Sequence, residues 1–133
     1  MEKTNVLFLL TPKTQVACLS EAMNVRQALE KMKAHGYAAI PLLSEEGEYL
    51  GTVSEGDLLH FITEKEEMKL ENLEYVPISR VLVKDRVPAV KVDADMEELA
   101  NLIINQNFVP VVDDRNVLMG IVTRKRVMQE LLK

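Results

Sequence analysis

The sequence predicts an α+β fold that is built from two copies of one β-α-β-β-α unit, packed about a pseudo-twofold axis. The first observation is an apolar strand around a proline, which occurs at Ile40–Leu43 and again at Val109–Val112. The second is a glycine followed by two strand residues and a hydroxyl, at Gly51–Ser54 and Gly120–Thr123. Both pairs have the same spacing of 69 residues. A fixed spacing of this kind indicates an internal repeat.

Length and composition agree with one compact module over residues 1–133. The chain is 47% hydrophobic and 28% charged, which is ordinary for a globular protein. A single copy of about 50 residues would bury too little surface to be stable alone, so the two copies are expected to share one core. We place repeat 1 at residues 14–63, a linker at 64–86 and repeat 2 at 87–133.

In the first copy a strand is expected near residues 15–19, followed by a helix over 24–35. The helix is indicated by apolar residues at i, i+3, i+4 and i+7, which are Val25, Ala28, Leu29 and Met32. Gly36 stands where a helix carboxyl end favours glycine. Strands are expected over 38–43 and 48–53. Ser54 then begins another helix.

The second copy follows the same order. A strand is expected near residues 89–92, and Asp93 or Asp95 caps a helix with the stripe Met96, Leu99, Ala100 and Ile103. Strands follow over 108–112 and 118–122. The last helix carries Val127, Met128, Leu131 and Leu132.

Two apolar segments are expected to lead into the copies. Ile78, Val81 and Leu82 predict a turn of helix before the second copy, and Val6–Pro12 is expected to do the same for the first. The charged run at residues 64–69 either extends a helix or forms a solvated loop.

Several function classes are not expected. A formal net charge of −5 does not favour nucleic acid, and no apolar stretch is long enough to span a membrane. Val6–Leu10 is too short for a signal peptide, so we expect a cytoplasmic protein. Cys18, the one cysteine, fits a small buried thiol in a reducing compartment better than a nucleophile. No P-loop, Gly-x-Ser-x-Gly or Cys/His metal spacing occurs, so we expect no catalytic residue, no metal and no enzyme.

The repeated pattern resembles a tandem pair of cystathionine-β-synthase (CBS) domains, also called a Bateman module. The similarity covers residues 14–133. The segments Gly36–Pro41 and Asn105–Pro110 and the Thr123-Arg124 ending resemble the small stand-alone CBS-pair proteins of Gram-positive bacteria, some of which bind cyclic di-AMP. The resemblance implies face-to-face packing of the two copies, two clefts between them for adenosine-containing ligands, pairing into homodimers, and a role as a sensor.

The resemblance implies that cleft one combines the Ser54–Asp57 turn with strands of the second copy. Its implied residues are Thr52, Ser54, Asp57, Pro88, Ala89, Asn107, Phe108, Val109 and Pro110. Asp57 could accept both ribose hydroxyls with its two carboxylate oxygens. The alternative is that Ser54 and Asp57 only cap the helix, with the acid near the positive end of its dipole.

Cleft two is implied to join the second turn to strands of the first copy. Its implied residues are Val16, Ala17, Tyr37, Ala38, Ala39, Ile40, Pro41, Ile121, Thr123, Arg124 and Arg126. Arg126 departs from the ribose-binding Asp of the family. Cations in a first helical turn oppose the helix dipole, whereas a phosphate there would meet N–H groups and guanidinium together. The alternative is a solvated basic helix end, neutralised by Asp113, Asp114 or Glu130.

The base would lie against Val16, Ala17, Ala38 and Ala39, because small side chains let a purine approach the backbone. Tyr37 is either an aromatic contact or an ordinary half-buried strand residue. The sequence therefore predicts a non-catalytic regulatory module without a cofactor. It would sense AMP, ADP, ATP or cyclic di-AMP and signal to an unidentified protein target. The alternative is a ligand-free dimerisation or docking scaffold.

Overall fold

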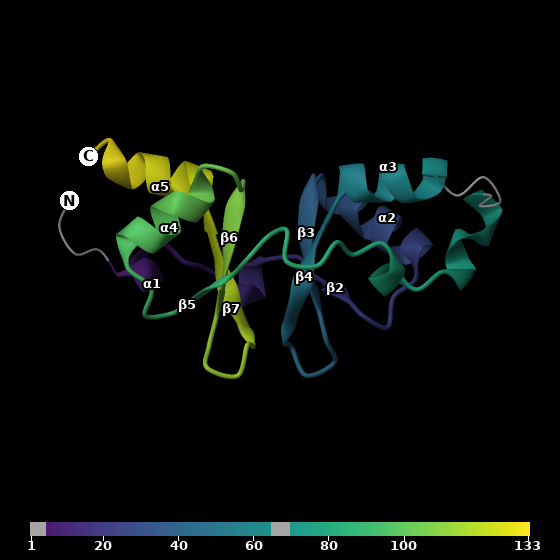
Figure 1. The fold of residues 1–133 in the computed structure, drawn as a ribbon, viewed down its shortest axis with the longest axis horizontal. Coiled ribbons are helices and arrows are strands. Elements are labelled where there is room, and N and C mark those ends of the chain that lie inside the picture. Colours follow the sequence, from purple (N-terminus) through teal and green to yellow (C-terminus); the bar gives the residue numbers. More distant parts are fainter. Residues whose placement is uncertain (1–4, 65–69) are drawn as a thin grey trace. The chain divides into compact units, whose positions relative to one another are not determined.

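The computed structural model describes residues 5–64 and 70–133. The chain divides into two compact units, of which the first contains Ala17–Arg86. The second combines Val87–Lys133 with the amino-terminal residues up to Val16. Figure 1 shows a pair of long strands with helices beside it in each unit. The predicted α+β class and the two β-α-β-β-α copies are confirmed, and their packing about a pseudo-twofold axis stays a prediction.

The first unit contains a three-stranded sheet in the order β2-β3-β4. β2 (Leu19–Ser20) runs parallel to β3 (Ala39–Leu43), which pairs antiparallel with β4 (Tyr49–Ser54). Helix α2 (Val25–His35) connects β2 to β3, and α3 (Glu55–Glu64) follows β4 directly. The parallel neighbours are joined by a helix because a crossover connection needs that length of chain.

Helix α2 shows how the sequence sets the ends of an element. The Asn24 side chain accepts the N–H of Gln27 at 2.8 Å, and the Gln27 side chain accepts the N–H of Asn24 at 2.9 Å. This capping box satisfies two amides that the first helical turn leaves without partners. Gly36 ends the helix at φ 69°, a left-handed conformation that glycine adopts without strain.

The second unit contains a four-stranded sheet in the order β1-β7-β6-β5. β5 (Val90–Lys91) runs parallel to β6 (Phe108–Val112), which pairs antiparallel with β7 (Leu118–Thr123). Helix α4 (Met96–Ile103) connects β5 to β6, and α5 (Arg124–Leu131) follows β7. Asp95 and not Asp93 caps α4, since its Oδ1 accepts the N–H of Glu98 at 2.8 Å.

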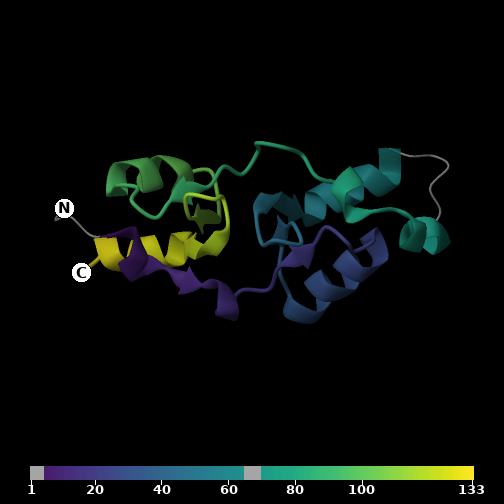
Figure 2. The same cartoon turned by 90° about the horizontal axis from the view of Figure 1, so that it is seen from below.

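The two lead-in segments serve the opposite copies from those that we expected. Helix α1 (Val6–Leu9) buries Val6 and Leu9 in the core of the second unit, and β1 (Thr11–Pro12) pairs with β7. The amino-terminal segment therefore lies with the carboxy-terminal copy, as both ribbon views show (Figure 1, Figure 2). The other lead-in segment packs against the first copy: the short helices η2 (Leu70–Tyr75) and η3 (Ile78–Arg80) contribute Leu73 and Ile78 to the core of the first unit.

A glycine in each copy makes room for the exchanged segment. A Cβ at Gly120 would lie 2.2 Å from the carbonyl oxygen of Thr11, and one at Gly51 would lie 2.7 Å from Leu82 Cδ1. Both separations are shorter than real contacts. A side chain at Gly120 would displace the backbone of the lead-in segment, whereas one at Gly51 would force the Leu82 side chain to move. The repeated glycine therefore marks a close approach of the lead-in segment to the last strand of each copy.

The first strand of the first copy was predicted too early. Residues 13–15 form the short helix η1 (Lys13–Gln15), and the strand β2 covers only Leu19–Ser20. Most of the charged run that we expected at residues 64–69 lies outside the described residues. No helix in the described part of the chain is both long and apolar enough to cross a membrane.

Candidate functional site

The turn between β4 and α3 contains the reciprocal capping that the sequence allowed. The N–H of Asp57 donates to Ser54 Oγ at 3.0 Å, and the N–H of Ser54 donates to Asp57 Oδ2 at 2.8 Å. Two amides at the start of α3 are thereby satisfied, and an acid lies at the positive end of the helix. The capping interpretation of this pair is thus present in the structure.

Arg86 adds a contact that the sequence did not reveal. Its Nη2 donates to Asp57 Oδ2 and lies 3.4 Å from Ser54 Oγ. Asp57 is buried, with only 6% of the whole residue exposed. Burial raises the pKa of Asp57, but hydrogen bonds from Arg86 and Ser54 and the charge of Arg86 lower it by more, so this pKa lies below the ordinary carboxyl value. The charged sequence Lys84-Asp85-Arg86 is typical of a solvated turn, and all three residues are exposed, but the Arg86 guanidinium is also paired with Asp57.

Thr52, the other candidate residue on β4, is engaged within its own strand. The Thr52 hydroxyl lies 2.7 Å from the phenolic oxygen of Tyr49, and both side chains are buried. Burial raises the pKa of Tyr49 to about 12, against the opposing effect of the hydrogen bond with Thr52. Thr52 consequently supports the strand that ends at Ser54.

The equivalent turn in the second unit has a different set of partners. Thr123 Oγ1 accepts the N–H of Arg126 at 3.1 Å and so caps α5. Nothing in the turn replaces the carboxylate of Asp57, since Arg126 stands at that position. The two turns therefore share a hydroxyl cap and differ in the charge that the next helical turn presents.

Arg124 is held at the end of α4. Its Nε donates to the carbonyl of Ile103 at 3.0 Å, and its Nη1 donates to Asn107 Oδ1 at 3.2 Å. A guanidinium there satisfies carbonyls at the negative end of a helix. The amide of Arg124 also donates to the Asn107 carbonyl at 2.9 Å, just as Glu55 donates to Ala38 in the first unit. Arg124 and Asn107 thus fix the junction of β7 with α5.

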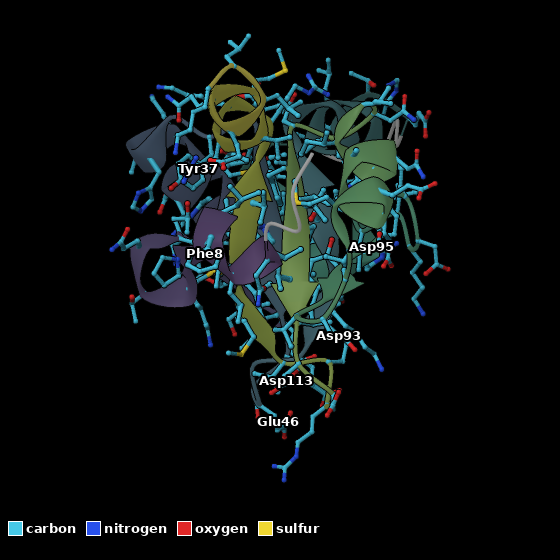
Figure 3. All side chains as sticks on the ribbon, turned by 90° about the vertical axis from the view of Figure 1, so that its left-hand side faces the viewer. Phe8, Tyr37, Glu46, Asp93, Asp95 and Asp113 are labelled. Atoms are coloured by element: carbon cyan, nitrogen blue, oxygen red, sulfur yellow. The ribbon has the colours of Figure 1, made fainter. Side chains whose placement is uncertain are left out.

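Arg126 pairs with Glu130, one of the three acids that we weighed as its neutraliser. Arg126 Nη1 lies 3.3 Å from Glu130 Oε2, which Lys133 also reaches at 3.3 Å. Lys133 first, and Arg126 after it, lower the pKa of Glu130 against the opposing effect of desolvation. Asp113 instead accepts amides of its own hairpin at 2.8 and 3.0 Å. Figure 3 shows Asp113 at the tip of that hairpin, at the opposite end of the strands from α5.

Lys125 is the cation of this turn that we did not single out. It is exposed, and it forms no ion pair with any residue that the structure describes. Its neighbours Arg124 and Arg126 are both engaged, as described above. The signal was available in the sequence, because Lys125 lies between two arginines in the first turn of a helix.

The apolar candidates in the first unit differ in what they can offer a ligand. Ile40 and Pro41 are buried, and Ile40 belongs to the core of its unit. Ala38 is exposed, whereas Ala17 and Ala39 are half-buried. Tyr37 is also half-buried, and its ring lies 5.6 Å from that of His35. The small side chains and Tyr37 are therefore accessible, and Ile40 could contribute only backbone atoms.

The candidates in the second unit show the same division. The side chains of Phe108, Val109 and Pro110 are buried on β6. Val16 and Ile121 are half-buried, as is Ala89. Gln106, which the sequence analysis missed, is buried and donates through Nε2 to the carbonyls of Pro88 at 3.3 Å and Phe108 at 3.1 Å. It thereby fixes the backbone of two of the predicted cleft-one residues.

Within each unit, the strand pairing places candidates side by side. Ala39 pairs with Ser54 and Pro41 with Thr52 in the first unit. Phe108 pairs with Thr123 and Pro110 with Ile121 in the second. The combination of each turn with strands of the other copy stays a prediction. Among the described residues, no group of three or more His, Cys, Asp and Glu side chains could hold a metal ion.

Comparison with known proteins identifies the family. The CBS domain matches twice, over residues 9–64 and 78–133, which together cover most of the chain. The chain belongs to the CBS-domain family. This CBS pair is 29% identical over 119 residues to the cyclic di-AMP receptor B of Bacillus subtilis, covering 90% of this chain and 80% of the receptor.

Solved structures of similar chains have the same fold as this CBS pair. A conserved hypothetical protein of Geobacillus kaustophilus has a TM-score of 0.88 at 28% identity, with 98% of this CBS pair and 97% of that chain covered. The CbpB protein of Listeria monocytogenes, solved in complex with c-di-AMP, has a TM-score of 0.85 at 27% identity. The match to CbpB covers 95% of this chain and 93% of that one. The CBS pair therefore shares its fold with proteins of which one was solved in complex with c-di-AMP.

Proposed function

We propose that this CBS pair is a regulatory sensor of an adenine nucleotide, that cyclic di-AMP is the ligand, and that the Thr123–Arg126 turn holds its phosphate. The observation that carries the proposal is the first turn of α5, where the exposed Lys125, which forms no ion pair within the described part of the chain, lies between two arginines. The similarity to a cyclic di-AMP receptor supports the choice of nucleotide.

The chemistry of the two turns favours a cyclic dinucleotide at α5. A 3′,5′-linked cyclic dinucleotide has a phosphodiester on each 3′-oxygen, so each ribose keeps only its 2′-hydroxyl. The lack of a carboxylate in the turn therefore costs little binding affinity, because this ligand has no vicinal diol that needs two acceptors. A phosphodiester at this turn would meet the amides of the helix start, the Lys125 ammonium and the Arg126 guanidinium.

The base and the remaining contacts are proposed to come from the first copy. The accessible small residues Ala17, Ala38 and Ala39 would let a purine approach the backbone, with Tyr37 at its edge. In this arrangement a single nucleotide joins both copies of the CBS pair. Its binding could then shift a conformational equilibrium of the module by the difference of its affinities for the two states.

Homodimerisation and a protein target complete the proposal, together with a cytoplasmic location, no catalytic activity and no cofactor. Large apolar side chains remain exposed on α1, on α5 and just after α5, among them Phe8, Leu131 and Leu132. These exposed side chains are also the observation that favours the alternative of a ligand-free docking scaffold. The two functions differ in whether the purified protein binds a nucleotide.

Isothermal titration calorimetry of the CBS pair with cyclic di-AMP tests the proposal. Lys125→Ala should weaken binding by roughly 10- to 100-fold, because a hydrogen bond to a charged group is worth about 1.5–3 kcal/mol. Lys33→Ala, which removes an exposed lysine from α2, is the matched control and should leave the affinity unchanged. Unchanged affinity in Lys125→Ala would place the phosphate elsewhere, and no binding by the unmodified protein would favour the scaffold.

A further inference from the structure

Arg86 occupies the acceptor atom that a ribose would need in the first copy. Its guanidinium and the N–H of Ser54 both reach Asp57 Oδ2. Within the described residues, no hydrogen bond of Asp57 involves Oδ1. Arg86 is the last residue of the first unit, and its side chain comes from 29 residues further along the chain than the turn it contacts.

We infer that Arg86 is a specificity residue that closes the Ser54–Asp57 turn to nucleotides with a free vicinal ribose diol, so that each chain binds one adenine nucleotide and not two. This inference rests on the proposed function, in which the other turn holds the ligand. A vicinal diol donates best when both carboxylate oxygens are available to it. A linear nucleotide such as AMP would therefore have to displace Arg86 from Oδ2.

Replacement of Arg86 by a ribose diol is unfavourable because of where the charges of Asp57 and Arg86 lie. The Asp57 side chain is 3% exposed, whereas that of Arg86 is 44% exposed. A nearly buried carboxylate needs a cation or several strong donors, because an uncompensated buried charge is costly. Neutral hydroxyls would replace a cationic donor, so the diol gains hydrogen bonds at the cost of the ion pair.

The experiment counts binding sites by calorimetry, with AMP and cyclic di-AMP titrated separately. The unmodified CBS pair should bind one cyclic di-AMP per chain and AMP weakly or not at all. Arg86→Ala should gain an AMP site with at least tenfold higher affinity than the unmodified protein shows. Asp57→Asn in the Arg86→Ala background should remove that site. 2′-Deoxy-AMP, which lacks the diol, should bind Arg86→Ala much less tightly than AMP does.

Lys84→Ala is the matched control, since it removes an exposed positive charge two residues from Arg86. It should leave AMP binding as in the unmodified protein. If Arg86→Ala is not folded by circular dichroism, Arg86→Gln keeps donors at this position without the charge and should show a smaller gain of the same kind.

The inference is overturned if folded Arg86→Ala and Arg86→Gln bind AMP no better than the unmodified protein, or if the gained site survives Asp57→Asn. The proposed function fails separately, when the unmodified protein binds no cyclic di-AMP. An AMP site that appears only in the Arg86 variants would support the inference even in that case.

Discussion

Asp57 combines two roles that a sequence cannot separate. Its carboxylate caps α3 through Ser54 and is neutralised by Arg86. Capping alone would require only an acid near a helix start. The ion pair with Arg86 also links this turn to the last residue of the first unit. Any ligand at this turn must therefore compete with an interaction that the folded chain already makes.

The stability of the CBS pair should depend on the ionisation of Asp57. Because its pKa is lower in the folded than in the unfolded state, ionised Asp57 stabilises the fold fully at pH values above the ordinary carboxyl pKa of 3.8. That contribution is lost as the pH falls from this value through the lower, folded-state pKa. Urea unfolding at pH 7 and pH 3 measures the effect. Asp57→Asn should lose less stability between the two pH values than the unmodified protein does.

Equal acid losses in both proteins would show that the pair with Arg86 contributes nothing to the fold. Asp114→Asn is the matched control, because Asp114 is exposed and forms no ion pair with a described residue. Its acid-induced loss should equal that of the unmodified protein.

Glu130 competes with an anionic ligand for the Arg126 guanidinium. The Glu130 carboxylate is shared by Arg126 and Lys133. Glu130→Gln removes the competing charge, so it should tighten cyclic di-AMP binding several-fold at low ionic strength, with a smaller effect as salt screens the charges. Calorimetry at two salt concentrations measures this. Weaker binding by Glu130→Gln would mean that Glu130 orients Arg126 toward the ligand instead of competing for it.

Each copy is stabilised by a lead-in segment that precedes the other copy in the sequence. Helix α1 has two buried residues, Val6 and Leu9, in the core of the second unit. The helix is only four residues long, and a helix this short is not stable alone. Its burial against the second copy therefore holds it in place, together with the pairing of β1 with β7.

Leu9→Ala should destabilise the second unit selectively. Leu9 is 1% exposed, and truncating a buried leucine costs about 2–5 kcal/mol. Phe8→Ala is the matched control, because Phe8 lies on the same helix and is 76% exposed. That change should stay within about 0.5 kcal/mol. Urea unfolding gives the two costs, and hydrogen exchange locates them.

Amide protection should fall over residues 87–133 in Leu9→Ala and remain higher over residues 17–64. Loss of protection that begins in the first unit would contradict the assignment of α1 to the second core.

The elements were predictable from the sequence because their causes are local. The apolar stripe of α2, its Asn24 cap and Gly36 lie within a dozen residues, and the second copy repeats the same signals. Contacts between distant segments had no such signal. Nothing near Asp57 indicated Arg86, and nothing in Val6–Leu9 indicated which copy it would join. The expectation for the amino-terminal segment assumed that sequence neighbours pack together, which the exchange disproves.

The candidate site was predictable in part for the same reason. The hydroxyl caps Ser54 and Thr123 follow from the repeat. The partners of Arg124 and the role of Gln106 depend on where strand β6 brings the end of α4, so the residue types alone could not assign them. Lys125 became a candidate only when both of its neighbours proved to be engaged.

The whole molecule consists of two similar units with dissimilar turns. One turn has an acid that the chain itself neutralises. The other has three cations, of which Lys125 pairs with no acid among the residues that the structure describes. A CBS pair of this kind should respond to one anionic purine ligand per chain. Binding to the native state alone would also raise the thermal midpoint, in proportion to the logarithm of ligand concentration above Kd.

A crystal structure of the CBS pair grown with cyclic di-AMP would show directly which of the two turns holds the nucleotide. We expect a phosphodiester against the Thr123–Arg126 turn, in contact with Lys125, and an intact Arg86–Asp57 ion pair in the same chain. A nucleotide bound with its ribose on Asp57, or no nucleotide at the α5 turn at saturating ligand, would refute this assignment of the two turns.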